Sequence, residues 1–259
     1  MKTTNTKLNV SFVPGYYEIA KEMLDLFIGD AQKAIDTSGR FCAAISRYTP
    51  GTFFELLGSD IRSKSLPWDR IHLFCVDERC GSYDLGNNNF VMAMKSLVEQ
   101  VNLPSENVHR ICSKCSNCEY TASIYEQTLY DVIGCEDNEV PKFHLILLKM
   151  APDGHIASLF PDTYTFFESQ KLAQVSYFMD ARHTRITLTH PVLYAASRIA
   201  VYVSGREKAG ILNEIFTNEP NIAQYPIHAL WPILDKVIWL IDYDAGRFLL
   251  PPLLYREPA

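Results

Sequence analysis

One histidine in this sequence directly follows a turn, within the stretch "KMAPDGHIASLFPD" (residues 149–162). A histidine titrates near neutral pH, so His155 has the chemistry of a general base that activates water. Asp153 is placed to orient that base, and Gly154 between them adopts the positive φ of a sharp turn at little cost. The apolar run at 143–148 predicts a buried strand, and the apolar residues after His155 predict a short helix. In parallel α/β sheets, ligands bind at the carboxyl ends of the strands, where this arrangement places Asp153 and His155.

The composition indicates an ordinary globular protein with a large hydrophobic core. Of its 259 residues, 47% are hydrophobic and 21% are charged. No apolar run approaches the roughly 20 residues of a membrane span, and the first residues lack the apolar segment of a secretory signal. The formal charge of −6 argues against broad nucleic-acid binding. We therefore expect no membrane and no nucleic-acid partner, although a local cluster of Arg and Lys can still attract a small anion.

The seven cysteines, an odd number without a secretory signal, favour reduced thiols and a cytoplasmic location. Cys112, Cys115 and Cys118 follow one another at C-x-x-C spacing, which can ligate zinc or an iron–sulfur cluster. A fourth ligand is not evident, although His109 and Cys135 are candidates. The favoured interpretation is a polar loop that leads into a helix, so no metal is predicted and the cluster stays as the alternative.

Strands and helices alternate along most of the chain. Apolar runs predict strands at 41–45, 71–76, 143–148, 185–189, 198–205 and 236–242. Helical spacing predicts helices at 14–36, within 49–57, and at 87–101, 122–133 and 206–216. Such alternation indicates a largely parallel sheet covered on both faces. Because no linker or repeat interrupts it, we predict a single three-layer α/β domain over residues 1–259 with a mostly parallel central sheet.

Five blocks of the sequence resemble, in order, those of the 6-phosphogluconolactonase family. They are "LFCVDERCGSYDLGNNNFVMA", "FHLILLKMAPDGHIASLFPD", "RITLTHPVL", "VYVSGREKAGIL" and "YPIHALWP", and with the first strand they span residues 41 to 232. The resemblance implies a Rossmann-like fold of the sugar-phosphate isomerase/lactonase type. It also implies hydrolysis of a small anionic sugar phosphate, 6-phospho-D-glucono-1,5-lactone, in the pentose phosphate pathway, without a metal or other cofactor. The oligomeric state stays open.

The resemblance also implies roles for individual residues. It assigns the general base to His155, and it makes Asp153 and Asp77 candidates to orient the base or the sugar hydroxyls. Arg79, in the same "DER" as Asp77, can face the lactone carbonyl or the phosphate. A lactone is an activated ester, so a positioned water and a base suffice, and a cation or backbone N–H groups stabilise the developing oxyanion.

For the phosphate, the resemblance points to Arg185 in "RITLT" and Lys208 in "GREKAG". An arginine fork and a lysine point charge are suitable partners for a phosphate dianion. Lys208 is also expected in the first turn of a helix, where the helix dipole favours an anion. The alternative is that both are solvated surface charges that flank strands.

The chain departs from the family in its phosphate loop. Where the family has S-G-G-S-T-P, this sequence has "ISRYTP", so Ser46 and Arg47 replace two glycines. Those glycines let backbone N–H groups approach the phosphate closely. We expect the Arg47 guanidinium to replace these donors, and Thr49 is retained as a phosphate-binding residue.

Three further departures surround the strand at 143–148. Lys149 and Ala151 replace two glycines of the family, and a positive φ at either would cost about 1–2 kcal/mol. His144 replaces an aspartate, and we expect it in the core or at its rim rather than in catalysis.

Two alternative functions stay open. Glucosamine-6-phosphate deaminases share this fold, but their motif carries a glutamate five residues after the histidine, where this chain has Phe160. A non-catalytic or altered-specificity sugar-phosphate-binding relative is compatible with the changed phosphate loop, although a binding protein has no chemical need for His155. A direct assay of lactone hydrolysis separates an enzyme from a binding protein.

Overall fold

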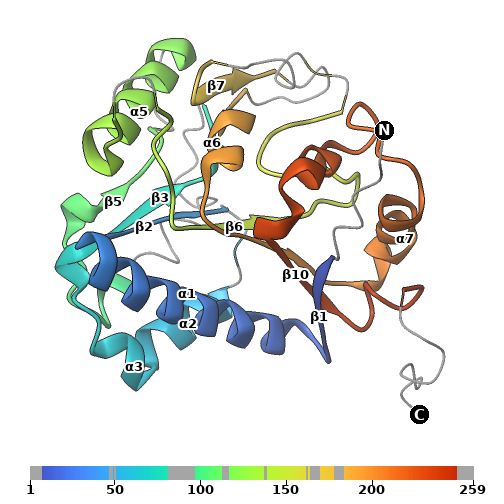
Figure 1. The fold of residues 1–259 in the computed structure, drawn as a ribbon, viewed down its shortest axis with the longest axis horizontal. Coiled ribbons are helices and arrows are strands. Elements are labelled where there is room, and N and C mark those ends of the chain that lie inside the picture. Colours follow the sequence, from blue (N-terminus) through green and yellow to red (C-terminus); the bar gives the residue numbers. More distant parts are fainter. Residues whose placement is uncertain are drawn as a thin grey trace.

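Seven strands form the central sheet of the computed structural model (Figure 1). In spatial order they are β1 (Asn9–Val13), β10 (Val237–Asp242), β9 (Ile199–Val203), β6 (Leu145–Lys149), β2 (Phe41–Ile45), β3 (Ile71–Cys75) and β5 (Val108–His109). Each of these neighbouring pairs is parallel, which confirms the predicted α/β class with a mostly parallel sheet. The structure describes residues 8–46, 49, 51–80, 97–112, 117–136, 139–161, 163, 170–177 and 184–249.

Helices cover both faces of this sheet. Figure 1 shows α1 (Tyr16–Ser38), α2 (Gly51–Ser59) and α3 (Ile61–Lys64) below it, and α5 (Cys118–Ile133) and α6 (His190–Ala195) above it. The other described helices are α7 (Ala209–Thr217) and the 3-10 segments η1 (Trp68–Arg70), η3 (Ser105–Asn107), η5 (Arg206–Lys208) and η6 (Pro226–Lys236). None of the helices in these ranges is long and apolar enough to cross a bilayer. Strands enclosed on both faces are apolar throughout, and every residue of β2 and β9 is buried.

The long helices follow the patterns from which they were predicted. The buried residues of α1 recur at helical intervals toward the core and are Ile19, Ala20, Met23, Leu24, Phe27, Ile28, Ala31 and Ala34. This helix ends at Gly39, whose φ of 78° makes it a left-handed C-terminal cap. Helix α5 begins before the predicted range because the Asn117 side chain caps it, accepting a 3.0 Å hydrogen bond from the Tyr120 N–H. The helix predicted at 87–101 lies largely outside the described residues.

A second, antiparallel sheet stands beside the first. It consists of β4 (Asp77–Arg79), β8 (Arg185–Leu188) and β7 (Ala173–Ser176), in the order β4-β8-β7. The strand predicted at 185–189 therefore belongs to this small sheet, and "DER" is itself a strand. Since Asp77 pairs with Thr187 and Arg79 with Arg185, the sheet brings the two blocks "DER" and "RITLT" together.

The prediction of a short helix after Gly154 is wrong. Residues 156–159 instead form a tight turn in which the Leu159 N–H donates to the Ile156 carbonyl over 3.0 Å. The backbone groups of Ser158 are occupied by tertiary contacts, because its N–H donates to Thr187 Oγ1 and its carbonyl accepts from a hydroxyl on β7. These contacts exclude a helical ladder at this position.

The expectation of reduced thiols is wrong for two cysteines. Cys80, directly after β4, forms a disulfide with Cys118, the first residue of α5, at a Cα–Cα distance of 6.0 Å. Cys118 is therefore not available as a thiolate metal ligand, and Cys115 lies outside the described residues. Cys112 and Cys135 are exposed free thiols, and within the described ranges no three His, Cys, Asp or Glu side chains gather as a metal site. The tertiary proximity of two segments 38 residues apart is not visible in the spacing of the cysteines.

Candidate functional site

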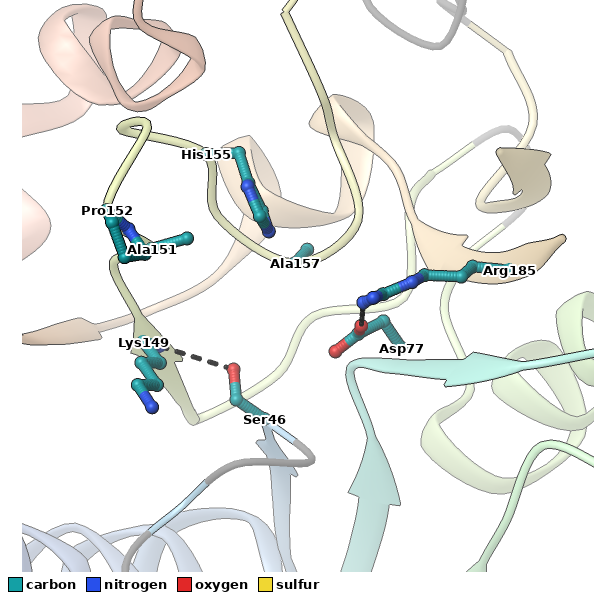
Figure 2. A pocket seen from close by; sticks show the side chains of 8 residues that line it. All are labelled: Ser46, Asp77, Lys149, Ala151, Pro152, His155, Ala157 and Arg185. Atoms are coloured by element: carbon teal, nitrogen blue, oxygen red, sulfur yellow. Dashed lines mark hydrogen bonds and ion pairs between the residues drawn. The ribbon is translucent and has the colours of Figure 1, made fainter. Parts of the chain in front are cut away.

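A cavity of about 230 Å³ opens where the carboxyl ends of β2 and β6 meet the second sheet. The described residues that line it are Ser46, Asp77, Lys149, Ala151, Pro152, His155, Ala157 and Arg185. Figure 2 shows the His155 imidazole pointing toward its middle, with Lys149 and Ser46 on one side and Asp77 and Arg185 on the other. Three of the predicted residues, Asp77, His155 and Arg185, thus come from separate blocks of the sequence and line one cavity.

A tight turn directs His155 into this cavity. The Gly154 N–H donates to the Ala151 carbonyl over 3.0 Å, and Gly154 has a φ of 78°. A side chain there would approach Tyr225 at 3.2 Å, so both space and backbone conformation favour glycine. The turn therefore has the shape predicted from the sequence.

Asp153 holds His155 through the imidazole Nδ1. Asp153 Oδ1 lies 2.6 Å from that nitrogen and also accepts the His155 backbone N–H at 3.2 Å. Burial alone would raise the pKa of Asp153, but the hydrogen bonds and charge of His155 outweigh it and hold the pKa below its usual value. An ionised Asp153 accepts the Nδ1 proton, which leaves the lone pair on Nε2, the nitrogen of a general base.

Asp77 is buried, and two side chains contact its carboxylate. Its Oδ2 accepts a 2.7 Å hydrogen bond from Ser158 Oγ and lies 3.6 Å from Nη1 of Arg185. The Arg185 guanidinium also lies 5.4 Å from the centre of the Phe160 ring, and that ring lies 4.5 Å from the His155 ring. Phe160 thus packs between the base and the cation, at the position where the deaminase motif has a glutamate.

Three other predicted substrate-binding residues that the structure describes, Thr49, Lys208 and Arg79, lie outside this lining. Thr49 is buried, and its hydroxyl accepts a 3.4 Å hydrogen bond from Tyr202. Lys208 is buried just before α7, and its Nζ donates to the Ser204 carbonyl over 2.5 Å. Arg79 lies two residues beyond Asp77, opposite Arg185 in the antiparallel ladder. Arg47 lies outside the described residues.

The two glycine replacements at Lys149 and Ala151 cause no backbone strain. Neither residue has a positive φ, so the cost that a positive φ would impose does not arise. In the described part of the chain, Ala157 is the non-glycine residue with a positive φ, 55°, and the contacts of Ser158 hold this turn in place.

Five residues of the cavity lining were not predicted to be functional: Ser46, Lys149, Ala151, Pro152 and Ala157. Three of them, Ser46, Lys149 and Ala151, stand where the family has glycines, which was the available signal. His144 has a structural role instead. Its Nδ1 accepts the Cys42 N–H at 3.0 Å at the amino end of β6, and burial lowers its pKa. This agrees with its expected place at the rim of the core.

Fold and site together define an α/β protein with a cavity at the carboxyl edge of a parallel sheet, beside a histidine–carboxylate pair. The family model described as glucosamine-6-phosphate isomerases/6-phosphogluconolactonase matches residues 16–239. The chain belongs to this family.

Individual relatives agree with this membership. A Nostoc sp. protein named 6-phosphogluconolactonase is 33% identical over 244 residues, which are 94% of this chain and 99% of the relative. A Synechocystis sp. protein of the same name is 36% identical over 220 residues, 85% of this chain and 89% of the relative. The solved structure of 6-phosphogluconolactonase from Leishmania guyanensis has a TM-score of 0.81 and 23% identity, covering 95% of this chain and 100% of that one. That likeness shows the shared fold.

Proposed function

We propose that the protein hydrolyses 6-phospho-D-glucono-1,5-lactone to 6-phospho-D-gluconate, as an enzyme of the pentose phosphate pathway. The observation that carries the proposal is the 2.6 Å contact of Asp153 with His155 Nδ1 in a cavity that also contains Arg185 and Lys149. The names of the Nostoc and Synechocystis relatives support the same activity.

The proposed chemistry begins with a water beside His155 Nε2. The imidazole takes a proton from the water as the oxygen attacks the lactone carbonyl carbon, and Asp153 stabilises the imidazolium that forms. The negative charge on the carbonyl oxygen is stabilised by a cation on the Asp77 side of the cavity, where we assign Arg185. When the bond to the ring oxygen breaks, His155 returns the proton to that oxygen, which gives the open-chain acid and regenerates the neutral base.

The sugar and its phosphate extend toward the remaining predicted residues. We assign Lys208 and Thr49 to the phosphate and Asp77 to the sugar hydroxyls, and Arg79 keeps its predicted place facing the lactone carbonyl or the phosphate. Arg47 remains a predicted phosphate ligand. Because Figure 2 separates Arg185 from Lys149 across the cavity, this assignment moves Arg185 from the phosphate to the carbonyl end.

Two further expectations accompany the function. The family match over residues 16–239 supports one lactonase-like domain over residues 1–259, and the location remains predicted as cytoplasmic. A deaminase reaction is disfavoured because Phe160 occupies the position of the ring-opening glutamate and packs against His155.

The test is lactone hydrolysis by the purified chain, with spontaneous hydrolysis subtracted. His155→Gln should lower kcat by about 10²- to 10⁴-fold, the usual contribution of a general base, with an unchanged melting temperature. His144→Gln is the matched control, because glutamine can still accept the Cys42 N–H and the residue lies away from the cavity. Full kcat in His155→Gln would exclude this residue as the base. No activity above the spontaneous rate in the native chain would exclude the lactonase function and favour a non-catalytic binding protein.

A further inference from the structure

The last residue of β6 contributes a lysine to the cavity. Lys149 stands where the family motif has a glycine, and its side chain lines the cavity that contains His155. Its backbone N–H donates to Ser46 Oγ over 3.3 Å, so strand β6 is fixed to the end of β2 at this point. Figure 2 shows the Lys149 side chain extending away from His155, toward the side of the sheet covered by α1 and α2.

The neighbours of Lys149 on that face are polar groups from the phosphate region. Lys149 is in register with Tyr202 of β9, and paired residues of neighbouring parallel strands point to the same face. The Tyr202 hydroxyl donates to Thr49 Oγ1 over 3.4 Å, and Ser46, before Thr49 in the same loop, is buried. Lys149 therefore belongs to the same face as the described residues of the phosphate loop.

A second lysine lies close enough to interact with it. Burial lowers the pKa of Lys149, and the carboxylate of Glu207 partly opposes this. Burial and then the charge of Lys149 lower the pKa of Lys208. Glu207 is largely exposed and lies 3.7 Å from Lys208 Nζ, so it is a solvent-screened counterion. Two mutually repelling cations at a buried edge are a favourable place for a doubly charged anion.

We propose that Lys149 binds the phosphate group of the substrate together with Lys208, and supplies charge that replaces the backbone donors lost with the glycines of the phosphate loop. This inference rests on the proposed function and names a phosphate ligand that the family motif does not contain. A lysine is a compact point charge that suits a phosphate dianion. Since Lys149 extends away from His155, the phosphate and the reacting carbonyl occupy different ends of the cavity.

The inference is tested with Lys149→Met, with Lys142→Met as its control, an exposed lysine before the same strand. Loss of a charge-assisted contact should raise KM for the phosphorylated lactone about ten- to a hundredfold, with a much smaller effect on kcat. The factor by which KM rises should be at least about tenfold larger for the phosphorylated lactone than for unphosphorylated gluconolactone. The inhibition constant of inorganic phosphate should rise in parallel, and Lys149→Arg should restore part of the affinity.

Two outcomes would overturn the inference. An unchanged KM in Lys149→Met would show that the lysine does not bind the phosphate. Equal losses on both lactones would show a general distortion of the cavity. Failure of the proposed function is distinguishable, because the native chain would then not hydrolyse the lactone at all. Calorimetric binding of inorganic phosphate to both variants would still decide whether Lys149 holds the anion.

Discussion

The hydroxyl of Ser158 donates a 2.7 Å hydrogen bond to Oδ2 of Asp77, a residue 81 positions earlier in the chain. Both side chains are buried. The bond ties the turn after His155 to the second sheet, and with it holds Ala157 at its positive φ against the cavity. The geometry of the candidate base thus depends on a contact between two distant segments.

Ser158→Ala should therefore lower both stability and activity. Removing one partner of a buried carboxylate costs about 1–3 kcal/mol, which for a chain of this size lowers the melting temperature by roughly 2–10 °C. Thermal unfolding and kcat are measured together, with Ser123→Ala, an exposed residue of α5, as the control. An unchanged melting temperature would contradict the view that Asp77 depends on this hydrogen bond.

Asp153→Asn should lower kcat while leaving the fold intact. An asparagine amide can donate to Nδ1, which moves the imidazole proton to Nε2 and removes the base, so a loss of about ten- to a thousandfold is expected. The exposed Asp69→Asn is a control of the same chemistry. If the Asp153 variant keeps native kcat, the carboxylate does not set the state of His155.

The fold was predictable wherever an element is defined by its own residues. Strands such as β2, β6 and β9 are continuous apolar runs, and α1 has a complete helical stripe. The strands β1, β4, β5 and β7 were missed. They have two to five residues each and form through their pairing with β10, β8, β3 and β8. The helix predicted after Gly154 failed for the related reason that distant partners bind Ser158.

The contacts of the candidate site were likewise predictable only where the two residues are close in the sequence. The contact of Asp153 with His155 follows from their spacing of two residues around a glycine. The contact of Asp77 with Arg185 depends on the second sheet, which the sequence did not reveal. Lys149 was recognised only as a replaced glycine, because its position in the cavity depends on where β6 ends beside β2.

Arg185→Lys should weaken hydrolysis of both lactones by similar factors. Arg185 lies beside Asp77, across the cavity from Lys149, so its assigned partner is the carbonyl that both substrates share. Loss of the planar fork should cost about tenfold in kcat/KM, and the exposed Arg70→Lys should cost nothing. A loss of kcat/KM confined to the phosphorylated lactone would instead show that Arg185 binds the phosphate, as the resemblance first implied.

The disulfide between Cys80 and Cys118 should stabilise the oxidised protein. Closing a loop of 38 residues stabilises a fold by about 4 kcal/mol in the chain-entropy model, which corresponds to roughly 10 °C in melting temperature. Reductant should remove this increment from the native chain and leave a Cys80→Ser, Cys118→Ser variant unaffected. Titration of seven free thiols under non-reducing conditions would show that the disulfide does not form.

The affinity for 6-phosphogluconate should fall as the pH rises above neutrality. The protonated lysine binds the anion, and burial lowers the pKa of both Lys149 and Lys208. The loss should therefore begin below the roughly pH 10.4 at which an ordinary lysine titrates. Glu207 faces both lysines and Asp242 faces Lys208, and each raises the lysine pKa, but both stay ionised throughout this range. The phosphate, with a second pKa of about 6, is a dianion above pH 7.5.

Calorimetry between pH 7.5 and 10 should show a steeper decline of the affinity for 6-phosphogluconate in the native chain than in Lys149→Met, where one titrating cation is gone. Identical slopes in the two proteins would mean that Lys149 does not carry the charge that binds the phosphate.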